Sequence, residues 1–153
     1  MKTKFTLILL VLLSIIGFSQ NDAKRIQSFN LEKKVAIQGY DPITYFTKNE
    51  AIKGNANFIY VYKGIEYHFS SDENKKIFEK NPDKYEPQYG GWCAYAIGKT
   101  GEKVTINPKT FKIIDNKLYL FYNANFTNTL KLWNKEEESL YKNANQNWEK
   151  INK

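Results

Sequence analysis

The fold is decided at residues 58–70, which read FIYVYKGIEYHFS. Two runs rich in aromatic and β-branched residues flank Lys63-Gly64, and this pair predicts a β-hairpin closed by a two-residue turn. A turn at these positions sets the register of the two strands. The facing pairs are then Tyr62 with Ile65, Tyr60 with Tyr67, and Ile59 with His68.

Side chains alternate between the two faces of a strand, so the second strand of this hairpin has an apolar face and a polar face. Ile65, Tyr67 and Phe69 form the apolar face. His68, the only histidine in the chain, lies on the other face with Glu66. His68 is therefore either a hydrogen-bonded structural residue or part of a functional site.

A helix is expected directly after the hairpin. Ser70, with Glu73 three residues later, fits a capping box. Ile77 and Phe78 give the helix a core face, and Pro82 ends it. Residues 83–88 are expected to be irregular.

The remaining sequence alternates short strands and helices. Residues 35–37 and 104–106 are expected to be short strands, and Asp115-Asn116 is expected to be the turn of a second hairpin. After Asn125, apolar residues recur at nearly helical spacing, at Leu130, Trp133, Leu140, Ala144, Trp148 and Ile151. The expected fold class is α+β, a small single domain with two β-hairpins, a short central helix and C-terminal amphipathic helices.

Asp41 lies in the turn Gly39-Tyr40-Asp41-Pro42. Proline is favoured at the first position of a helix, and aspartate is favoured just before it. Asp41 is therefore expected to cap a short helix, and its carboxylate is also a candidate ligand.

The only cysteine, Cys93, lies in the segment YGGWCAYA at residues 89–96. Two adjacent glycines let the backbone adopt positive φ, so the thiol is expected on a tight bend. A single thiol in an oxidising compartment is a liability unless it is buried or used. Cys93 is for this reason the main candidate for chemistry.

The N-terminus predicts export. Lys2 and Lys4 accompany an apolar run from Phe5 to Ile16, followed by Gly17-Phe18-Ser19. This pattern predicts a signal peptide cleaved after Ser19, and hence a periplasmic or secreted protein without stable membrane insertion after cleavage. Loss of the two lysines lowers the formal net charge from +7 to +5, and the charges are scattered, so no nucleic-acid partner is expected.

The order of these motifs resembles that of the exported YHS-domain proteins. Gly39-Tyr40-Asp41-Pro42 comes first, Tyr67-His68-Phe69 follows, and Gly90-Gly91-Trp92-Cys93 comes last. The resemblance runs from about Val35 to the C-terminus, which implies a YHS-like domain at 35–153. With the signal peptide predicted at 1–19, residues 20–34 are left as an N-terminal arm. The resemblance also implies a small α+β domain related to modules of copper- and heavy-metal-handling proteins. Some exported relatives are described as selenoproteins, with selenocysteine at the position that looks like Cys93.

The chain also departs from the metal-binding pattern of that family. Metal-binding YHS modules carry cysteines after the Asp-Pro pair and beside the histidine motif, whereas this chain has Ile43, Thr44, Ser70 and Ser71 there. A structural zinc site needs about four nitrogen or sulfur ligands, which one cysteine and one histidine cannot supply.

Three functions remain open. The leading hypothesis is a module that binds a soft metal ion such as copper, with Cys93, His68 and Asp41 as candidate ligands. The second is a thiol redox or peroxide-reactive protein, in which Cys93 is the catalytic nucleophile, His68 is its base and an external small thiol completes turnover. The third is a non-catalytic binding or structural module with a buried cysteine.

Overall fold

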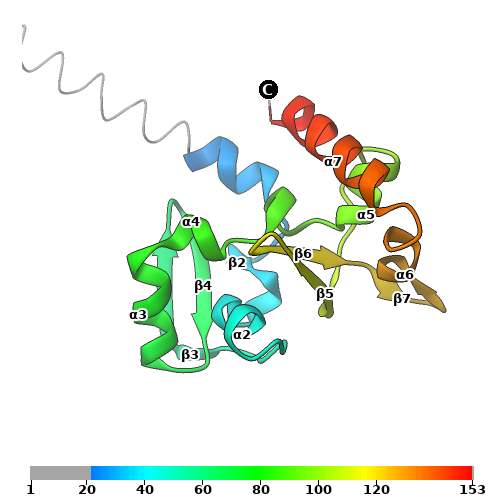
Figure 1. Ribbon diagram of the computed structural model, residues 1–153. Helices are drawn as coiled ribbons and strands as arrows, with labels where there is room; N and C mark the ends of the chain where they lie inside the picture. Colours follow the sequence, from blue (N-terminus) through cyan, green and yellow to red (C-terminus); the bar gives the residue numbers. More distant parts are fainter. Residues whose placement is uncertain (1–21, 153) are drawn as a thin grey trace, which may run out of the picture.

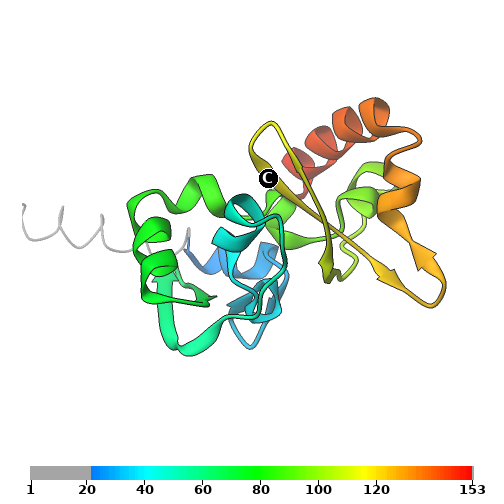
Figure 2. The ribbon, with the colours of Figure 1, turned by 60° about the horizontal axis from the view of Figure 1, so that its bottom comes forward.

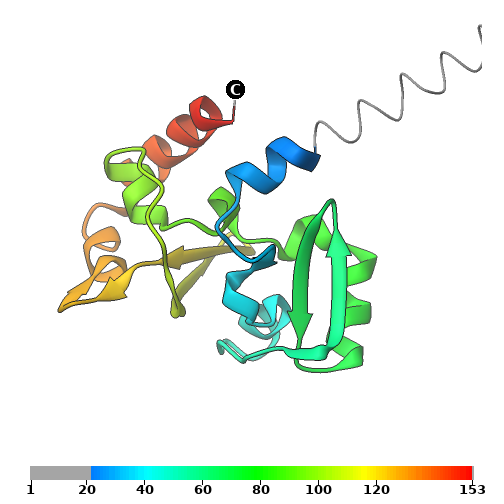
Figure 3. The same ribbon diagram turned by 180° about the vertical axis from the view of Figure 1, so that it is seen from behind.

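The computed structural model describes residues 22–152, which form a mixed α+β fold (Figure 1). The predicted signal peptide lies outside these residues. A four-stranded sheet with its helices occupies one side of the molecule, and a second hairpin with the C-terminal helices occupies the other, as Figure 3 also shows from behind. Within residues 22–152, no helix is both long and apolar enough to cross a bilayer.

The first hairpin has the predicted turn and register. Strands β3 (Asn55–Tyr62) and β4 (Ile65–Phe69) pair antiparallel, and the three expected residue pairs face each other. Two short strands, β1 (Leu31–Glu32) and β2 (Val35–Ala36), extend the sheet in the order β1-β2-β4-β3. β2 runs parallel to β4, so the N-terminal segment lies against the strand that carries His68.

The apolar face of β4 forms the centre of the core. Ile65, Tyr67 and Phe69 are fully buried. The rings of Tyr67 and Phe69 lie 4.7 and 5.2 Å, centroid to centroid, from that of Phe78 on α3 (Asp72–Lys80). Aromatic pairs at such distances contribute about 0.5–1.5 kcal/mol each beyond burial of their area. This cluster holds α3 against the sheet.

Two expectations about this region were wrong. The N-cap of α3 is Ser71, whose hydroxyl accepts the N–H of Asn74, while the side chain of Ser70 donates to Asp41. The segment expected to be irregular contains a short helix, α4 (Pro82–Tyr85). Proline ends one helix but also suits the first position of the next, so the same residue does both here.

The second hairpin turns at Asp115-Asn116 as predicted, between β5 (Asn107–Ile114) and β6 (Lys117–Phe121). Residues 104–106, expected to be a strand, are irregular. A further small hairpin, β7 (Asn123–Ala124) with β8 (Thr127–Asn128), was not predicted. It protrudes from the end of the molecule that carries the C-terminal helices (Figure 2).

Three helices pack around the second hairpin: α5 (Ala94–Lys99), α6 (Thr129–Trp133) and α7 (Glu137–Ile151). Trp133, one of the apolar residues at helical spacing, is fully buried. α5 and α7 approach closely at Gly98, where a Cβ atom would lie 2.6 Å from the carbonyl oxygen of Leu140. Glycine is therefore required at this crossing.

Candidate functional site

Asp41 is a structural hub at the start of α2 (Pro42–Thr47). Its Oδ1 accepts the N–H of Ile43 at 2.9 Å, which confirms the predicted helix cap. Its Oδ2 accepts three more hydrogen bonds, from the backbone N–H and hydroxyl of Ser70 and from the side-chain amide of Asn74, at 2.6–2.7 Å. The side chain is fully buried, and its four donors join α2, the end of β4 and α3. These bonds occupy the carboxylate.

His68 makes a local pair on the polar face of β4. Its Nε2 lies 2.5 Å from Oε1 of Glu66, two residues earlier on the same strand. Its Nδ1 faces η1 (Ile37–Gly39), since a Cβ atom at Gly39 would lie 3.4 Å from it. His68 is thus a hydrogen-bonded residue of the sheet.

Cys93 follows the bend that the glycine pair predicted. Gly90 and Gly91, in η2 (Gln88–Gly91), have φ values of 59° and 80°. Cys93 then caps α5, and its backbone N–H donates to the carbonyl oxygen of Val104 at 2.9 Å. This bond ties residue 104 to the start of α5. The side chain of Cys93 is fully buried.

The sulfur of Cys93 belongs to a closed hydrogen-bond network. It accepts the backbone N–H of Tyr122 at 3.3 Å and lies 3.3 Å from Oγ1 of Thr129. The Thr129 hydroxyl has one proton, and it donates that proton to the carbonyl oxygen of Tyr122 at 2.8 Å. The thiol must therefore donate its own proton to Oγ1 of Thr129. A neutral thiol satisfies every member of this network.

The structure does not bring Cys93, His68 and Asp41 into one ligand set. β4, which carries His68, and α5, which Cys93 caps, lie on opposite sides of the molecule (Figures 1 and 3). Among residues 22–152, no three His, Cys, Asp or Glu side chains are grouped so that they could hold a metal ion. The predicted three-residue site is not assembled, because each of these side chains is committed to a separate local network.

A small cavity of about 220 Å³ adjoins Cys93. Tyr122 and Thr129 line it together with Cys93, and Tyr95 and Val104 contribute apolar walls. A ligand in this cavity would lie beside the thiol network described above.

A larger cavity, of about 760 Å³, lies where both ends of the described chain meet the segment before Cys93. Its walls come from the helical segment 22–28 with Phe29, from residues 86–90, and from the end of α7 at Trp148. The N-terminal segment is fixed there by two hydrogen bonds. The N–H of Asn30 donates to the carbonyl oxygen of Gly90 at 2.8 Å, and the indole N–H of Trp92 donates to that of Ser28 at 2.7 Å.

A buried charged network lies at this cavity. Oε1 of Glu86 accepts hydrogen bonds from the guanidinium of Arg25 and from the hydroxyl of Tyr67. Burial raises the pKa of Glu86, although both donors act in the opposite direction. Burial also raises the pKa of Tyr67 well above its ordinary value, and the neighbouring carboxylate adds to this effect.

Sequence reasoning missed Arg25, Glu86 and Trp148. Arg25 lies in a polar segment, and Glu86 lies in the stretch expected to be irregular. Their proximity depends on how three distant segments fold together, which no local pattern encodes. Trp148 could only be assigned to a helix face.

Residues 43–89 match the family model of the YHS domain. This range contains His68 and Glu86, begins after Asp41 and ends before Cys93. It is shorter than the predicted domain at 35–153, whose limits stay a prediction. No curated protein and no solved structure matches the chain.

Proposed function

Because this chain contains a YHS domain, at residues 43–89, we propose that it is a non-catalytic binding module whose ligand occupies the cavity of about 760 Å³. This cavity is the observation that carries the proposal. Pockets that hold small molecules have volumes of about 300–1,000 Å³ and combine apolar walls with a few polar groups. Here Phe29, Pro87 and Trp148 supply apolar surface, and Arg25 and Glu86 supply polar groups.

The position of the cavity supports a role in binding. Lys63, Asp83 and Glu86 come from the matched range 43–89, whereas Arg25 and Trp148 come from the segments before and after it. Ligand sites are common at such junctions between structural units. The flanking segments would then add a binding site to the YHS domain.

The arrangement of Cys93 and His68 favours binding over thiol catalysis. A catalytic thiol is activated by a base within hydrogen-bond reach. His68 pairs with Glu66, and the Cys93 thiol donates to Thr129. The redox hypothesis for Cys93 is therefore the less well supported alternative.

The test is a titration with phenylnaphthylamine, an uncharged aromatic probe, monitored by its fluorescence. In one variant, Ser28→Phe, a bulky side chain replaces a serine that lines the cavity. The matched control is Ser139→Phe, because both serines donate to the carbonyl oxygen three residues earlier at 2.9 Å and Ser139 is outside this cavity. We expect saturable binding that Ser28→Phe weakens and Ser139→Phe leaves unchanged. Absence of saturable binding, or equal effects of both variants, would overturn the proposal.

A soft metal ion such as copper, bound by Cys93, is the second candidate function. YHS domains are associated with metal binding, including copper, and thiolates are preferred ligands of Cu(I). The cavity of about 220 Å³ beside Cys93 favours this site. His68 and Asp41 are held in separate hydrogen-bond networks and do not fit as further ligands of this ion. The remaining ligands of the copper ion would come from a small external thiol.

Titration with Cu(I) under reducing conditions tests the metal proposal. One equivalent should bind to the unaltered protein and to His68→Ala, and none should bind to Cys93→Ser. The proposal fails if Cys93→Ser binds as much copper as the unaltered protein.

We also infer that the protein is exported and that residues 1–19 are its signal peptide. The basic and apolar pattern before Ser19 supports this assignment. Sequencing the N-terminus of the protein recovered outside the cytoplasm should give Gln20 as the first residue. Recovery of an intact N-terminus would contradict the assignment.

A further inference from the structure

We propose that the cavity of about 760 Å³ selects a small organic anion, and that Arg25 binds its oxyanion while aromatic side chains bind its apolar body. This inference rests on the proposed binding function, and it adds the chemical class of the ligand.

Arg25 has an unused hydrogen-bond donor. One terminal nitrogen of its guanidinium binds Glu86, and its Cζ lies 4.2 Å from the centroid of the Phe29 ring. Its Nε is buried, and it has no hydrogen-bond partner among residues 22–152. Buried donors in folded proteins nearly always have an acceptor. Arg25 lines the cavity, so a ligand oxygen there would supply that acceptor once the guanidinium turns toward it.

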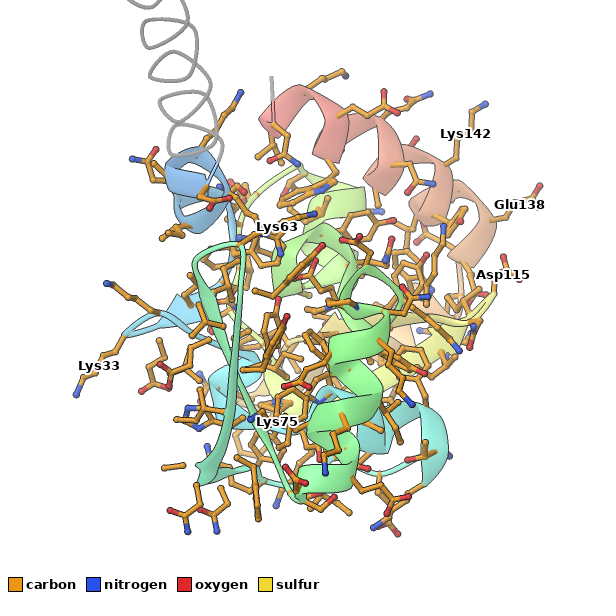
Figure 4. The ribbon with its side chains drawn as sticks, turned by 90° about the vertical axis from the view of Figure 1, so that its left-hand side faces the viewer. Lys33, Lys63, Lys75, Asp115, Glu138 and Lys142 are labelled. Atoms are coloured by element: carbon orange, nitrogen blue, oxygen red, sulfur yellow. The ribbon has the colours of Figure 1, made fainter. Side chains whose placement is uncertain are left out.

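The acidic side chains around Arg25 do not favour a cationic ligand. Oε1 of Glu86 already accepts from Arg25 and from Tyr67, so its negative charge is compensated. Oδ1 of Asp83 lies 3.5 Å from Nζ of Lys63, so these two opposite charges pair at the cavity edge. Figure 4 shows Lys63 at the tip of the β3–β4 hairpin, beside the helical segment 22–28. The lining also includes Asp22 and Lys24, so three acidic residues face three basic residues and the formal charges balance. The Nε donor of Arg25 is then the feature that selects the ligand.

The cavity walls near Gly90 are aromatic, because Phe29, Tyr89 and Trp148 all line the cavity and pack close to this glycine. A Cβ atom at Gly90 would lie 3.0 Å from Cη2 of Trp148 and 3.2 Å from Cδ2 of Phe29. The ring of Tyr89 lies 6.1 Å from that of Trp148. These aromatic side chains favour contact with another ring, because offset and edge-to-face ring pairs are favourable. An aromatic or similarly flat ligand with a carboxylate or sulfonate fits both features.

Two probes that differ by one charged group test the inference. Anilinonaphthalene sulfonate has an aromatic body like that of phenylnaphthylamine, with a sulfonate added. The anionic probe should bind at least about tenfold more tightly, because a hydrogen bond to a charged group supports a factor of this size. Arg25→Gln should abolish that preference. Lys142→Gln removes the same charge from an exposed position on α7 outside the cavity, labelled in Figure 4, and should leave the preference intact.

The outcomes separate this inference from the proposed function. If neither probe binds, the proposed function fails and the inference fails with it. If both probes bind with similar affinity to the unaltered protein, the inference fails and the binding function stands. The same holds if Arg25→Gln keeps the preference for the anion.

Loss of Arg25 leaves the buried carboxylate of Glu86 without its cation, so Arg25→Gln is also compared with the double variant Arg25→Gln, Glu86→Gln. The double variant removes both charges of the pair. It should bind the two probes with similar affinity, because the group that prefers the anion is gone. A preserved preference in the double variant would refute the role of Arg25.

Discussion

Replacement of Asp41 by alanine should be among the most destabilising single changes in the protein. The substitution removes the N-cap of α2, which is worth about 1 kcal/mol. It also leaves the three groups that donate to Oδ2 without their charged acceptor. Hydrogen bonds to a charged group contribute about 1.5–3 kcal/mol each, but their effects are not additive, so the expected total loss is about 3–5 kcal/mol.

Urea unfolding, followed by tryptophan fluorescence, measures this loss. Ser71→Ala is the matched control, because the Ser71 side chain caps α3 through one hydrogen bond and should cost only about 1 kcal/mol. The free energy of unfolding should therefore fall about three times further for Asp41→Ala than for Ser71→Ala. Equal losses would show that the carboxylate is not a structural hub, and would reopen its assignment as a ligand.

Three further predictions concern packing, access and pH. Gly98→Ala places a Cβ atom 2.6 Å from the carbonyl oxygen of Leu140, so it should cost about 1–3 kcal/mol in urea unfolding; an unchanged midpoint would contradict the close contact. The Cys93 thiol is fully buried, so iodoacetamide should modify it only as fast as the surrounding structure opens, and rapid alkylation of the folded protein would refute this. Burial raises the pKa of Glu86 above 4.5 in the folded state, so its contribution to stability is present below pH 4.5 and is lost as pH rises through the folded pKa. Urea unfolding measured from pH 4.5 upward should show this loss of unfolding free energy in the unaltered protein and not in Glu86→Gln. The same pH dependence in both proteins would refute the role of Glu86.

The hairpins and their register were predictable because the information is local. Lys63-Gly64 and Asp115-Asn116 fix their turns, and alternation then assigns the buried side chains. The helix cap at Asp41 follows from Pro42 in the same way. These features depend on residues within a few positions of each other, so a single sequence contains what is needed to predict them.

The candidate site was not predictable to the same degree. Cys93 and His68 are the two residues with the most distinctive chemistry, and the sequence gives no distance between them. Each finds its partners nearby in space, Thr129 for Cys93 and Glu66 for His68, so neither needs the other. The cavity at Arg25 and Trp148 was missed because it joins residues 123 positions apart in the chain, and periodicity carries no information about such pairs.

The cavity that Arg25 and Trp148 share also has a consequence for the order of assembly. Phe29 and Trp148 both approach Gly90, so the pocket has walls from the first, middle and last parts of the described chain. Contacts between distant positions form late, after their loop-closure entropy has been overcome. A growing chain can complete the local β3–β4 hairpin early, but it cannot enclose a ligand until α7 has been synthesised. A fragment limited to residues 43–89 lacks Arg25, Phe29 and Trp148, and therefore lacks these walls of the pocket.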